Sequence, residues 1–283
     1  MTPRLNFWLL SLIVLIAVPF YWLLVDNRPG DVQTKPVTIG QLRALATLQP
    51  GQAPSQIRYE AVAMKRRVRA LDAAGRGIRP DRLYNLAYKL VFPEQSPILI
   101  GTGILREHAI QKGYHWHDQA AHYRVERALA QARRVLLPAP GKTHSGGLTL
   151  LSRNAPDKAA ALVATNENRA SDAAYAIAPG VVVIPTPERG EATQLVFVRL
   201  VSGREYLFVG DLAATRWNID EMRAPARLAT DFRNSKDRQA IFDWLYTVNL
   251  IKVQAPALTI VTGNKVAKER GLIRGFIPPP ATQ

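Results

Sequence analysis

Hydrophobic residues are arranged along the chain in three different patterns. Positions 7–25 form an unbroken apolar run without a charged side chain. In 118–134 and 237–250, apolar residues recur mostly at spacings of three and four, which predicts amphipathic helices. Short apolar runs predict strands at 135–137, 180–184, 195–200, 205–209 and 257–261, with a hairpin turn at 201–204 and two shorter strands within 89–100. A capping-box pattern that begins at Thr38 predicts a further short helix, and the mixture predicts an α/β layered domain.

The apolar run at the N-terminus has the length of a membrane span. Its nineteen residues, at about 1.5 Å each, nearly cross a hydrocarbon core of about 30 Å. Arg4 precedes the run and aromatic residues lie near both ends, so residues 1–25 are predicted to be an uncleaved signal anchor with a cytoplasmic N-terminus. A cleaved signal peptide is the main alternative, although no small-x-small cleavage site follows. A buried core helix would need a partner surface around its whole circumference.

The rest of the chain divides into a connecting segment and a folded domain. Residues 26–37 are polar and contain two prolines and a glycine, which predicts a juxtamembrane linker, and residues 38–283 are the predicted domain. The 37 basic and 22 acidic residues give a net charge of +15, which favours nucleic acid, anionic lipid or small anions as partners. The absence of cysteine excludes a disulfide scaffold, a cysteine-ligated metal and a thiol nucleophile.

Four segments carry a resemblance to a known family. They are Leu136-Leu137-Pro138-Ala139-Pro140-Gly141-Lys142-Thr143-His144-Ser145-Gly146-Gly147-Leu148, Gly180–Pro187, Gly203–Asp211 and Ile260–Asn264. Taken in order, they resemble the metal-binding loop, the G-H-T-P-G turn, the strand ending in G-D and the last histidine loop of the metallo-β-lactamase superfamily. A P-loop interpretation of 141–143 fails because the first glycine of that motif falls at Leu136.

This resemblance implies an αββα sandwich and metal-dependent hydrolysis, but most ligand positions are changed. His144 and Asp211 are retained, whereas the other five positions carry different residues: Ala139, Gly141, Arg189 and Asn264 in place of histidines, and Thr143 in place of aspartate. A further aspartate that the family commonly carries is Gly101 here. Two ligands cannot hold a binuclear zinc centre, so no cofactor is expected. Zinc is expected only if an altered site at His144 and Asp211 still binds metal.

Several replacements introduce positive charge. Arg189, Lys142 and Lys265 lie in three loops that would otherwise converge on metal. We hypothesise that these cations occupy the electropositive site, that Arg189 pairs with Asp211, and that the pocket still attracts an anion. The alternative is that they are ordinary solvated charges on loops that have diverged.

Other candidate sites have weaker signals. His115, His117 and His122 with Asp118 could form a transition-metal site, but a short H-x-H is more typical of a surface turn beside a helix start. The basic run Lys65–Arg69 could contact phosphates or anionic lipid, or be a solvated strand or loop face. No G-x-S-x-G motif is present, and the scattered tryptophans offer no stacking platform for nucleic acid.

These observations predict a single-pass membrane protein with one exported domain, and the family resemblance implies a bacterial inner membrane with the domain on the periplasmic side. Its predicted role is that of a pseudoenzyme of the metallo-β-lactamase fold that binds an anionic small molecule or an envelope protein, besides the lipid around its helix. The alternative is a hydrolase of ester, lactone or amide bonds with an altered mononuclear or metal-free site at His144 and Asp211. Candidate site residues are Thr143, His144, Arg189, Asp211 and Asn264.

Overall fold

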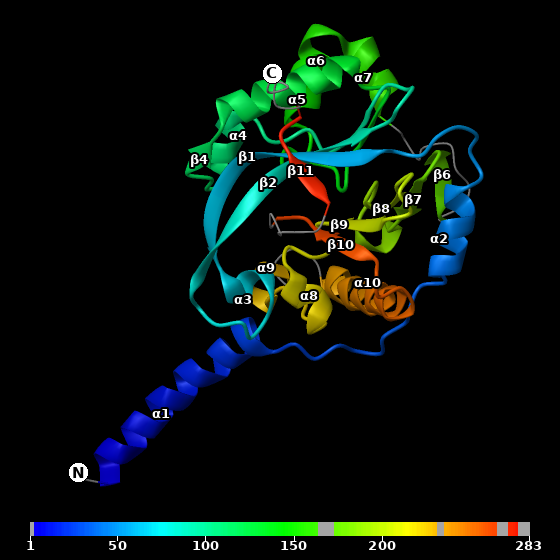
Figure 1. Cartoon of the computed structure of the whole chain (residues 1–283). Coiled ribbons are helices and arrows are strands. Elements are labelled where there is room, and N and C mark those ends of the chain that lie inside the picture. The colour runs from blue at the N-terminus through cyan, green and yellow to red at the C-terminus, as the bar shows by residue number, and fades with distance from the viewer. Residues whose placement is uncertain (1–2, 164–172, 231–234, 265–270, 277–283) are drawn as a thin grey trace.

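A computed structural model describes residues 3–163, 173–230, 235–264 and 271–276. One sheet contains β1 (Gln56–Val68), β2 (Pro80–Val91), β3 (Ile98–Ile100), β4 (Trp116–His117), β5 (Arg134–Leu136) and β11 (Leu272–Arg274), in the order β11-β1-β2-β3-β5 with β4 beside β1. The second sheet contains β6 (Tyr175–Ala178), β7 (Val181–Pro185), β8 (Gln194–Arg199), β9 (Glu205–Gly210) and β10 (Thr259–Thr262), in the order β10-β9-β8-β7-β6. The two sheets lie face to face (Figure 1).

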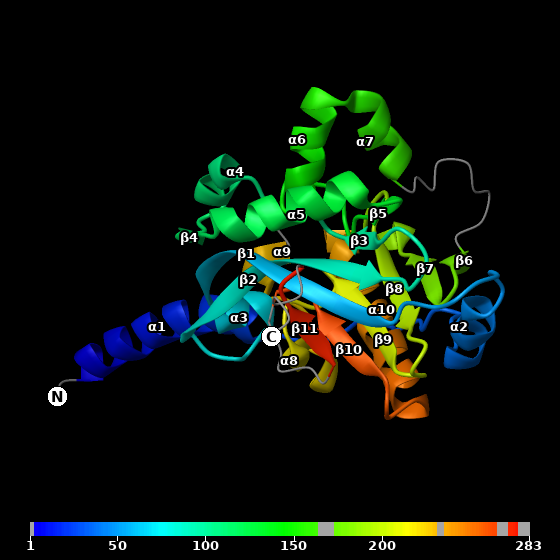
Figure 2. The same cartoon turned by 45° about the horizontal axis from the view of Figure 1, so that its top comes forward.

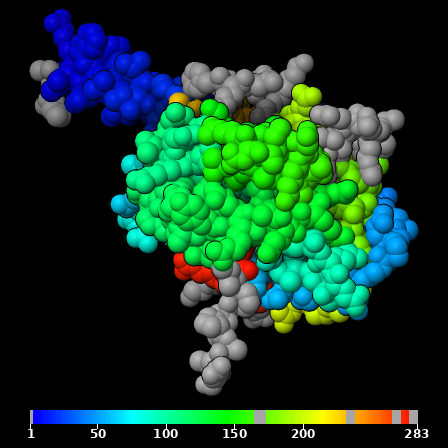
Figure 3. Space-filling model, turned by 90° about the horizontal axis from the view of Figure 1, so that it is seen from above, coloured from blue at the N-terminus to red at the C-terminus, as the bar shows by residue number. Residues whose placement is uncertain are grey.

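Helices cover the outer face of each sheet (Figures 1 and 2). The first sheet carries α5 (Gln119–Gln131), α6 (Gly146–Asn154) and α7 (Pro156–Leu162), with α4 (Arg106–Gln111) beside them; Figure 3 shows these segments covering one side of the molecule. The second sheet carries α2 (Ile39–Ala46), α8 (Arg216–Asp220) and α10 (Ser235–Gln254). The shorter helices are α3 (Arg69–Asp72), η2 (Pro187–Arg189) and α9 (Arg227–Thr230). The predicted αββα sandwich is therefore confirmed.

Alternating side chains of the strands build the layers. Tyr88 of β2 and Phe208 of β9 meet between the sheets with ring centroids 4.9 Å apart, as part of a buried apolar cluster. On the opposite face of β9, Leu207 packs towards Leu245 and Val248 of α10. Residues one apart in a strand point to opposite faces, so each central strand serves two apolar layers.

Several local predictions are confirmed and two need correction. Thr38 caps α2 by accepting from Gln41 N, and Asp118 caps α5 by accepting from Ala121 N. However, α5 ends at Gln131, and Arg134 belongs to β5 rather than to the last helical turn. The long strands β1 and β2 were missed because charged residues interrupt their apolar alternation, and the strand predicted from Lys89 begins at Pro80.

The apolar N-terminal segment is a helix that projects from the sandwich (Figure 1). It consists of α1 (Pro3–Phe20), none of whose residues is buried, and η1 (Tyr21–Val25), a π-helical turn. The helix has 23 residues, and an 18-residue window within it has a mean hydropathy of 2.4, so it is long and apolar enough to cross a membrane. The alternative of a buried core helix is wrong, because the helix lies outside the core.

The segment that follows this helix is not a free tether. Between residues 30 and 35 it lies along α10, where Gln33 N donates to Asp243 Oδ1 at 3.0 Å and Lys35 N donates to Thr247 Oγ1 at 2.8 Å. Lys35 Nζ also lies 2.7 Å from Glu188 Oε1 in η2. The chain between helix and domain is therefore held by specific hydrogen bonds.

Candidate functional site

The loop between β5 and α6 is fixed against the loop that follows β3. The carbonyl of His144 accepts hydrogen bonds from Thr102 N at 2.7 Å and Thr102 Oγ1 at 3.1 Å, and Gly146 N donates to Gly103 O at 2.8 Å. A Cβ on Gly146 would lie 2.7 Å from Leu105 N, closer than backbone atoms allow. The glycine pair that opens α6 thus permits the close approach that orients His144.

Asp211 is placed by the end of β9. Gly210 has φ of +49°, and a Cβ on it would lie 2.6 Å from Pro138 Cβ, so this residue must be small to let β9 meet the loop after β5. The carboxylate that follows lies 3.0 Å, Oδ1 to Nε2, from the imidazole of His144. Both retained ligand positions therefore contact each other directly.

The two groups stabilise each other's charged forms. Burial lowers the pKa of the His144 imidazole, but the charge and hydrogen bond of Asp211 outweigh it, so that the net shift is upward. For Asp211, desolvation raises the pKa, and the charge and hydrogen bond of His144, with the charges of Arg189 and Lys65, lower it to about 2. The pair therefore favours an ionised Asp211 carboxylate hydrogen-bonded to a protonated His144 imidazole.

These residues lie in a cavity of about 620 Å³ between the loops that end the strands. All seven ligand positions identified from the sequence line it: Ala139, Gly141, Thr143, His144, Arg189, Asp211 and Asn264. Lys142 lines it as well, whereas Lys265 lies outside the described residues. The alignment of the four sequence landmarks is therefore consistent with the fold, because segments far apart in the chain converge on one cavity.

Two of the altered positions act through charge and through the backbone. Arg189, in η2, lines the cavity and contributes to the low pKa of Asp211, while the direct hydrogen bond to that carboxylate comes from His144. The pairing of Arg189 with Asp211 therefore stays a prediction. Asn264 uses its carbonyl oxygen to accept from Tyr84 N at 2.7 Å, which joins the loop after β10 to the first sheet.

The cavity contains cationic residues that were not identified as site residues from the sequence. Lys65 and Arg67 of β1 line it, as does Lys112 after α4. Desolvation lowers the pKa of Lys65, and the charges of Arg67 and Lys112 lower it further. The sequence signal for these two residues is strand alternation within the basic run 65–69. It points Lys65 and Arg67 to the same face of the strand, here the face towards the cavity.

An aromatic side chain completes the cationic wall. Lys65 Nζ lies 4.6 Å from the ring centroid of Tyr114, which also lines the cavity. Desolvation and the charge of Asp211 raise the pKa of Tyr114 to about 12, so its hydroxyl stays protonated at neutral pH. Asn85 donates from Nδ2 to Thr143 O at 2.6 Å and holds the loop against this wall.

The side chains present do not fit a binuclear zinc centre. At the seven positions the potential zinc ligands are one imidazole and one carboxylate, which bond to each other, while the remaining positions offer a methyl group, a hydrogen, a hydroxyl, a guanidinium and an amide. Each zinc takes about four nitrogen, oxygen or sulfur ligands. Within the described residues no three His, Asp or Glu side chains are grouped as metal ligands.

The histidine-rich segment forms structural contacts instead. His117 Nε2 lies 3.1 Å from Ile104 O, and His122 Nε2 lies 3.1 Å from Glu126 Oε1. Burial and the neighbouring His117 lower the pKa of His122 to about 4. His115 is exposed, and the carboxylate of Asp118 is engaged as the helix cap. These contacts account for the segment without a metal.

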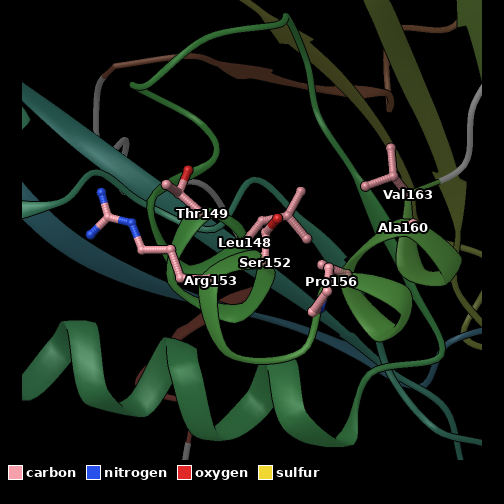
Figure 4. Close-up of a pocket in the computed structure, with 8 residues that line it drawn as sticks. Leu148, Thr149, Ser152, Arg153, Pro156, Ala160 and Val163 are labelled. Carbon is pink, nitrogen blue, oxygen red and sulfur yellow. The ribbon is translucent and has the colours of Figure 1, made fainter.

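A second hollow lies between α6 and α7, with a volume of about 440 Å³ (Figure 4). Its lining includes Leu148, Thr149, Arg153, Pro156 and Val163 and none of the residues predicted for the site. Arg153 contributes the only charged side chain among the described residues that line it. We therefore place the candidate site in the cavity that His144 and Asp211 line.

Comparisons with known proteins support the architecture. No protein-family model matches the sequence, and no curated protein does. Among solved structures, a quorum-quenching N-acyl homoserine lactone lactonase is 13% identical with a TM-score of 0.59, covering 78% of this chain and 96% of its own. An N-acyl homoserine lactone hydrolase, with N-hexanoyl-L-homoserine bound at its catalytic metal centre, is 12% identical with a TM-score of 0.57 over 76% and 95%. A probable metal-dependent hydrolase from Staphylococcus aureus is 9% identical with a TM-score of 0.50 over 76% and 91%. At such identities the likeness concerns the fold alone.

Proposed function

Because the chain has the metallo-β-lactamase fold, we propose that it uses the metal-site cavity of this fold to bind an anionic ligand through side-chain cations. One observation carries the proposal. Among the described residues that line the cavity, five are cationic, namely Lys65, Arg67, Lys112, Lys142 and Arg189, and two are carboxylates, namely Asp72 and Asp211. Positive charge that metal ions supply in a metal site is here supplied by ammonium and guanidinium groups.

The chemistry of the lining favours a compact oxyanion. Guanidinium groups bind carboxylate and phosphate in a fork geometry, and ammonium groups add charge without fixed direction. The protonated hydroxyl of Tyr114 provides a neutral donor on the same wall. Asp72 forms an ion pair with Arg67 at 3.3 Å and Asp211 a hydrogen bond with His144, so both carboxylates are already engaged. A carboxylate- or phosphate-bearing small molecule matches this lining.

The full chain, purified in detergent without chelator, tests the proposal. We expect elemental analysis to find no stoichiometric zinc or iron. We expect calorimetry to show binding of inorganic phosphate, and this binding should weaken about tenfold in Arg189→Gln because one charge-assisted hydrogen bond is lost. Arg127→Gln, at an exposed position of α5, is the matched control and leaves binding unchanged. Stoichiometric metal that disappears in a His144→Ala, Asp211→Ala double variant overturns the proposal.

A hydrolase with an altered site is the second candidate, favoured by the imidazole–carboxylate pair in the cavity. However, Nε2 of His144 is engaged by Asp211, and the raised pKa of His144 reduces the neutral form that a general base needs. Turnover of ester or lactone substrates that is lost in His144→Ala and retained in Arg127→Gln supports this second candidate instead.

We also propose that the protein is anchored in the bacterial inner membrane by its N-terminal helix, with the domain on the periplasmic side. Support comes from the exposed, apolar helix of 23 residues and from Tyr21 and Trp22 near its end. An envelope protein as a partner of the domain is part of the same proposal. Retention of the chain in the membrane fraction after alkaline extraction is the expected result, whereas release into the soluble fraction argues against an anchor.

A further inference from the structure

The hairpin of β1 and β2 reaches the end of the N-terminal helix. Its tip consists of α3 and the connection 73–79, and Gly75 N donates to Leu24 O at 2.9 Å. A Cβ on Gly75 would lie 3.5 Å from Val25 O, which shows how closely the two segments approach. Both cartoon views place α3 beside the end of the helix (Figures 1 and 2).

A buried ion pair fixes the helix end to the domain. Asp26 is 3% exposed and lies 2.8 Å from Arg227 Nη2 of α9, while Arg238 Nη2 donates to Asp26 O at 2.8 Å. The guanidinium of Arg227 also lies 4.1 Å from the ring centroid of Trp22. Because these contacts hold η1 against α9, the hairpin tip keeps a set position relative to the membrane-facing helix.

Of the six arginines between residues 66 and 82, three pair with carboxylates of the protein. Arg67 lies 3.3 Å from Asp72, Arg69 lies 3.7 Å from Asp81, and Arg76 lies 2.7 Å from Glu221. These ion pairs stabilise α3 and its surroundings. They leave the remaining three arginines as the charges available to an external partner.

The other three arginines, Arg66, Arg79 and Arg82, are exposed. Arg66 of β1 is directly opposite Arg82 of β2 in the strand register, and like charges at such positions are destabilising. Arg79 is exposed just before β2, and within the described part of the chain none of the three guanidinium groups has an ion-pair partner within 4 Å. Ile78, beside Arg79, is 65% exposed. An apolar tip flanked by unneutralised arginines fits an anionic, partly apolar surface.

Helix length sets the level of this tip. The helix of 23 residues is about 34 Å long and matches a hydrocarbon core of about 30 Å, so Leu24 reaches the interface. The hydrogen bond between Gly75 and Leu24 then brings residues 75–79 to the level of the lipid headgroups. Basic residues at this level are attracted to anionic lipid within about one Debye length.

We propose that residues 66–82, the hairpin tip with the adjoining strand ends, rest on the membrane and bind anionic phospholipid headgroups through Arg66, Arg79 and Arg82, with Ile78 in the interface. The inference rests on the membrane-anchoring part of the proposed function and is independent of the ligand in the cavity. Lys65 and Arg67 point to the opposite face of β1 and line the cavity, so the two cationic surfaces share a strand but have different roles.

The absence of cysteine allows a single-site probe on the full chain. An environment-sensitive fluorophore is attached to the cysteine of the Ile78→Cys variant. The labelled chain is placed in nanodiscs of phosphatidylcholine alone, or of phosphatidylcholine with phosphatidylglycerol at roughly one part in three. Nitroxide-labelled lipid in the discs serves as the quencher. Leu48→Cys, 68% exposed and two residues after the end of α2, is the matched control; Figure 1 shows α2 and α1 on opposite sides of the sandwich. We expect strong quenching at 78 in anionic discs, weaker quenching in neutral discs or high salt, and none at 48.

Charge-reversal variants identify the groups responsible. In the Ile78→Cys chain, Arg66→Glu, Arg79→Glu and Arg82→Glu together should remove the preference for anionic discs. Each arginine is expected to contribute roughly fivefold to the equilibrium constant for docking on anionic discs. Arg106→Glu, Arg127→Glu and Arg204→Glu together make the same change in net charge at exposed positions elsewhere and leave the preference intact.

Three results overturn the proposal. Equal quenching in neutral and anionic discs removes the headgroup assignment, and equal quenching at 78 and 48 removes the docking. A chain that is not retained in nanodiscs at all refutes the anchor itself, which separates failure of the proposed function from failure of this inference.

Discussion

The contact between His144 and Asp211 gives a prediction with a defined pH dependence. Asp211→Asn removes the carboxylate and leaves the buried imidazole, 7% exposed, without its charged partner. The lowering of the Asp211 pKa from 3.8 to about 2 corresponds to about 2.5 kcal/mol. Because the side chain is 44% exposed to the cavity, solvent screening reduces this, and we expect a loss of about 1 kcal/mol in the free energy of unfolding.

The sign of the pH dependence follows from both pKa shifts. The raised pKa of His144 makes its contribution complete below its unfolded value of 6.5 and removes it as the pH rises through the folded value. The lowered pKa of Asp211 makes its contribution complete above 3.8 and removes it as the pH falls towards 2. The stability difference between wild type and Asp211→Asn should therefore be greatest between about pH 4 and 6.5 and smaller at pH 9.

Thermal unfolding of the full chain in detergent, followed by circular dichroism at pH 5.5 and pH 9, measures this difference. A loss of about 1 kcal/mol corresponds to a Tm about 2–4 °C lower in the variant at pH 5.5. Asp157→Asn, an exposed carboxylate on α7, controls for the change of charge. A penalty that is equal at the two pH values, or larger at pH 9, contradicts the reasoning.

Two further predictions concern the backbone of the site and the root of the helix. Gly146→Ala should lower the free energy of unfolding by about 1–3 kcal/mol in urea titrations, because its Cβ would lie 2.7 Å from Leu105 N. Gly40→Ala in α2, where the nearest contact of the new Cβ is at 4.0 Å, should be neutral or stabilising. Equal effects of the two substitutions would refute the packing argument. Asp26→Ala should remove the buried carboxylate that pairs with Arg227 and speed hydrogen exchange at 26–37, while Asp31→Ala should have little effect; unchanged exchange in Asp26→Ala would show that the ion pair does not hold the helix.

The sequence predicted the elements whose pattern is set by burial on one face. The helix 118–134 and the strands around 181–209 have regular apolar spacing, and Asp118 and Thr38 are caps whose side chains act locally. The strands β1 and β2 could not be predicted in the same way. Charged residues interrupt their apolar alternation, and the polar positions of β1, such as Lys65, face a cavity formed by other loops.

The candidate site was partly predictable for a related reason. The seven ligand positions, five of them altered, could be aligned because each lies beside a strand end with a recognisable neighbour, such as the glycines at 146 and 210. Lys112 and Tyr114 had no such marker, since they follow a short helix and reach the cavity only through the packing of α4 beside β4 and β1. The structure therefore adds to the candidate site residues that reach the cavity through packing, and most of these residues are cationic.

Fixed side-chain cations and a metal centre do different chemistry in the same cavity. A zinc ion lowers the pKa of bound water to about 7 and so supplies a nucleophile at neutral pH. A guanidinium cannot do so, because it offers charge and N–H donors but no open coordination position, and it stays protonated throughout the physiological range. The cations around Asp211 can thus hold an anion in place of metal ions without activating the water that would attack it. On this reasoning the five altered ligand positions and the cations around them fit the anion-binding role that we propose better than they fit hydrolysis.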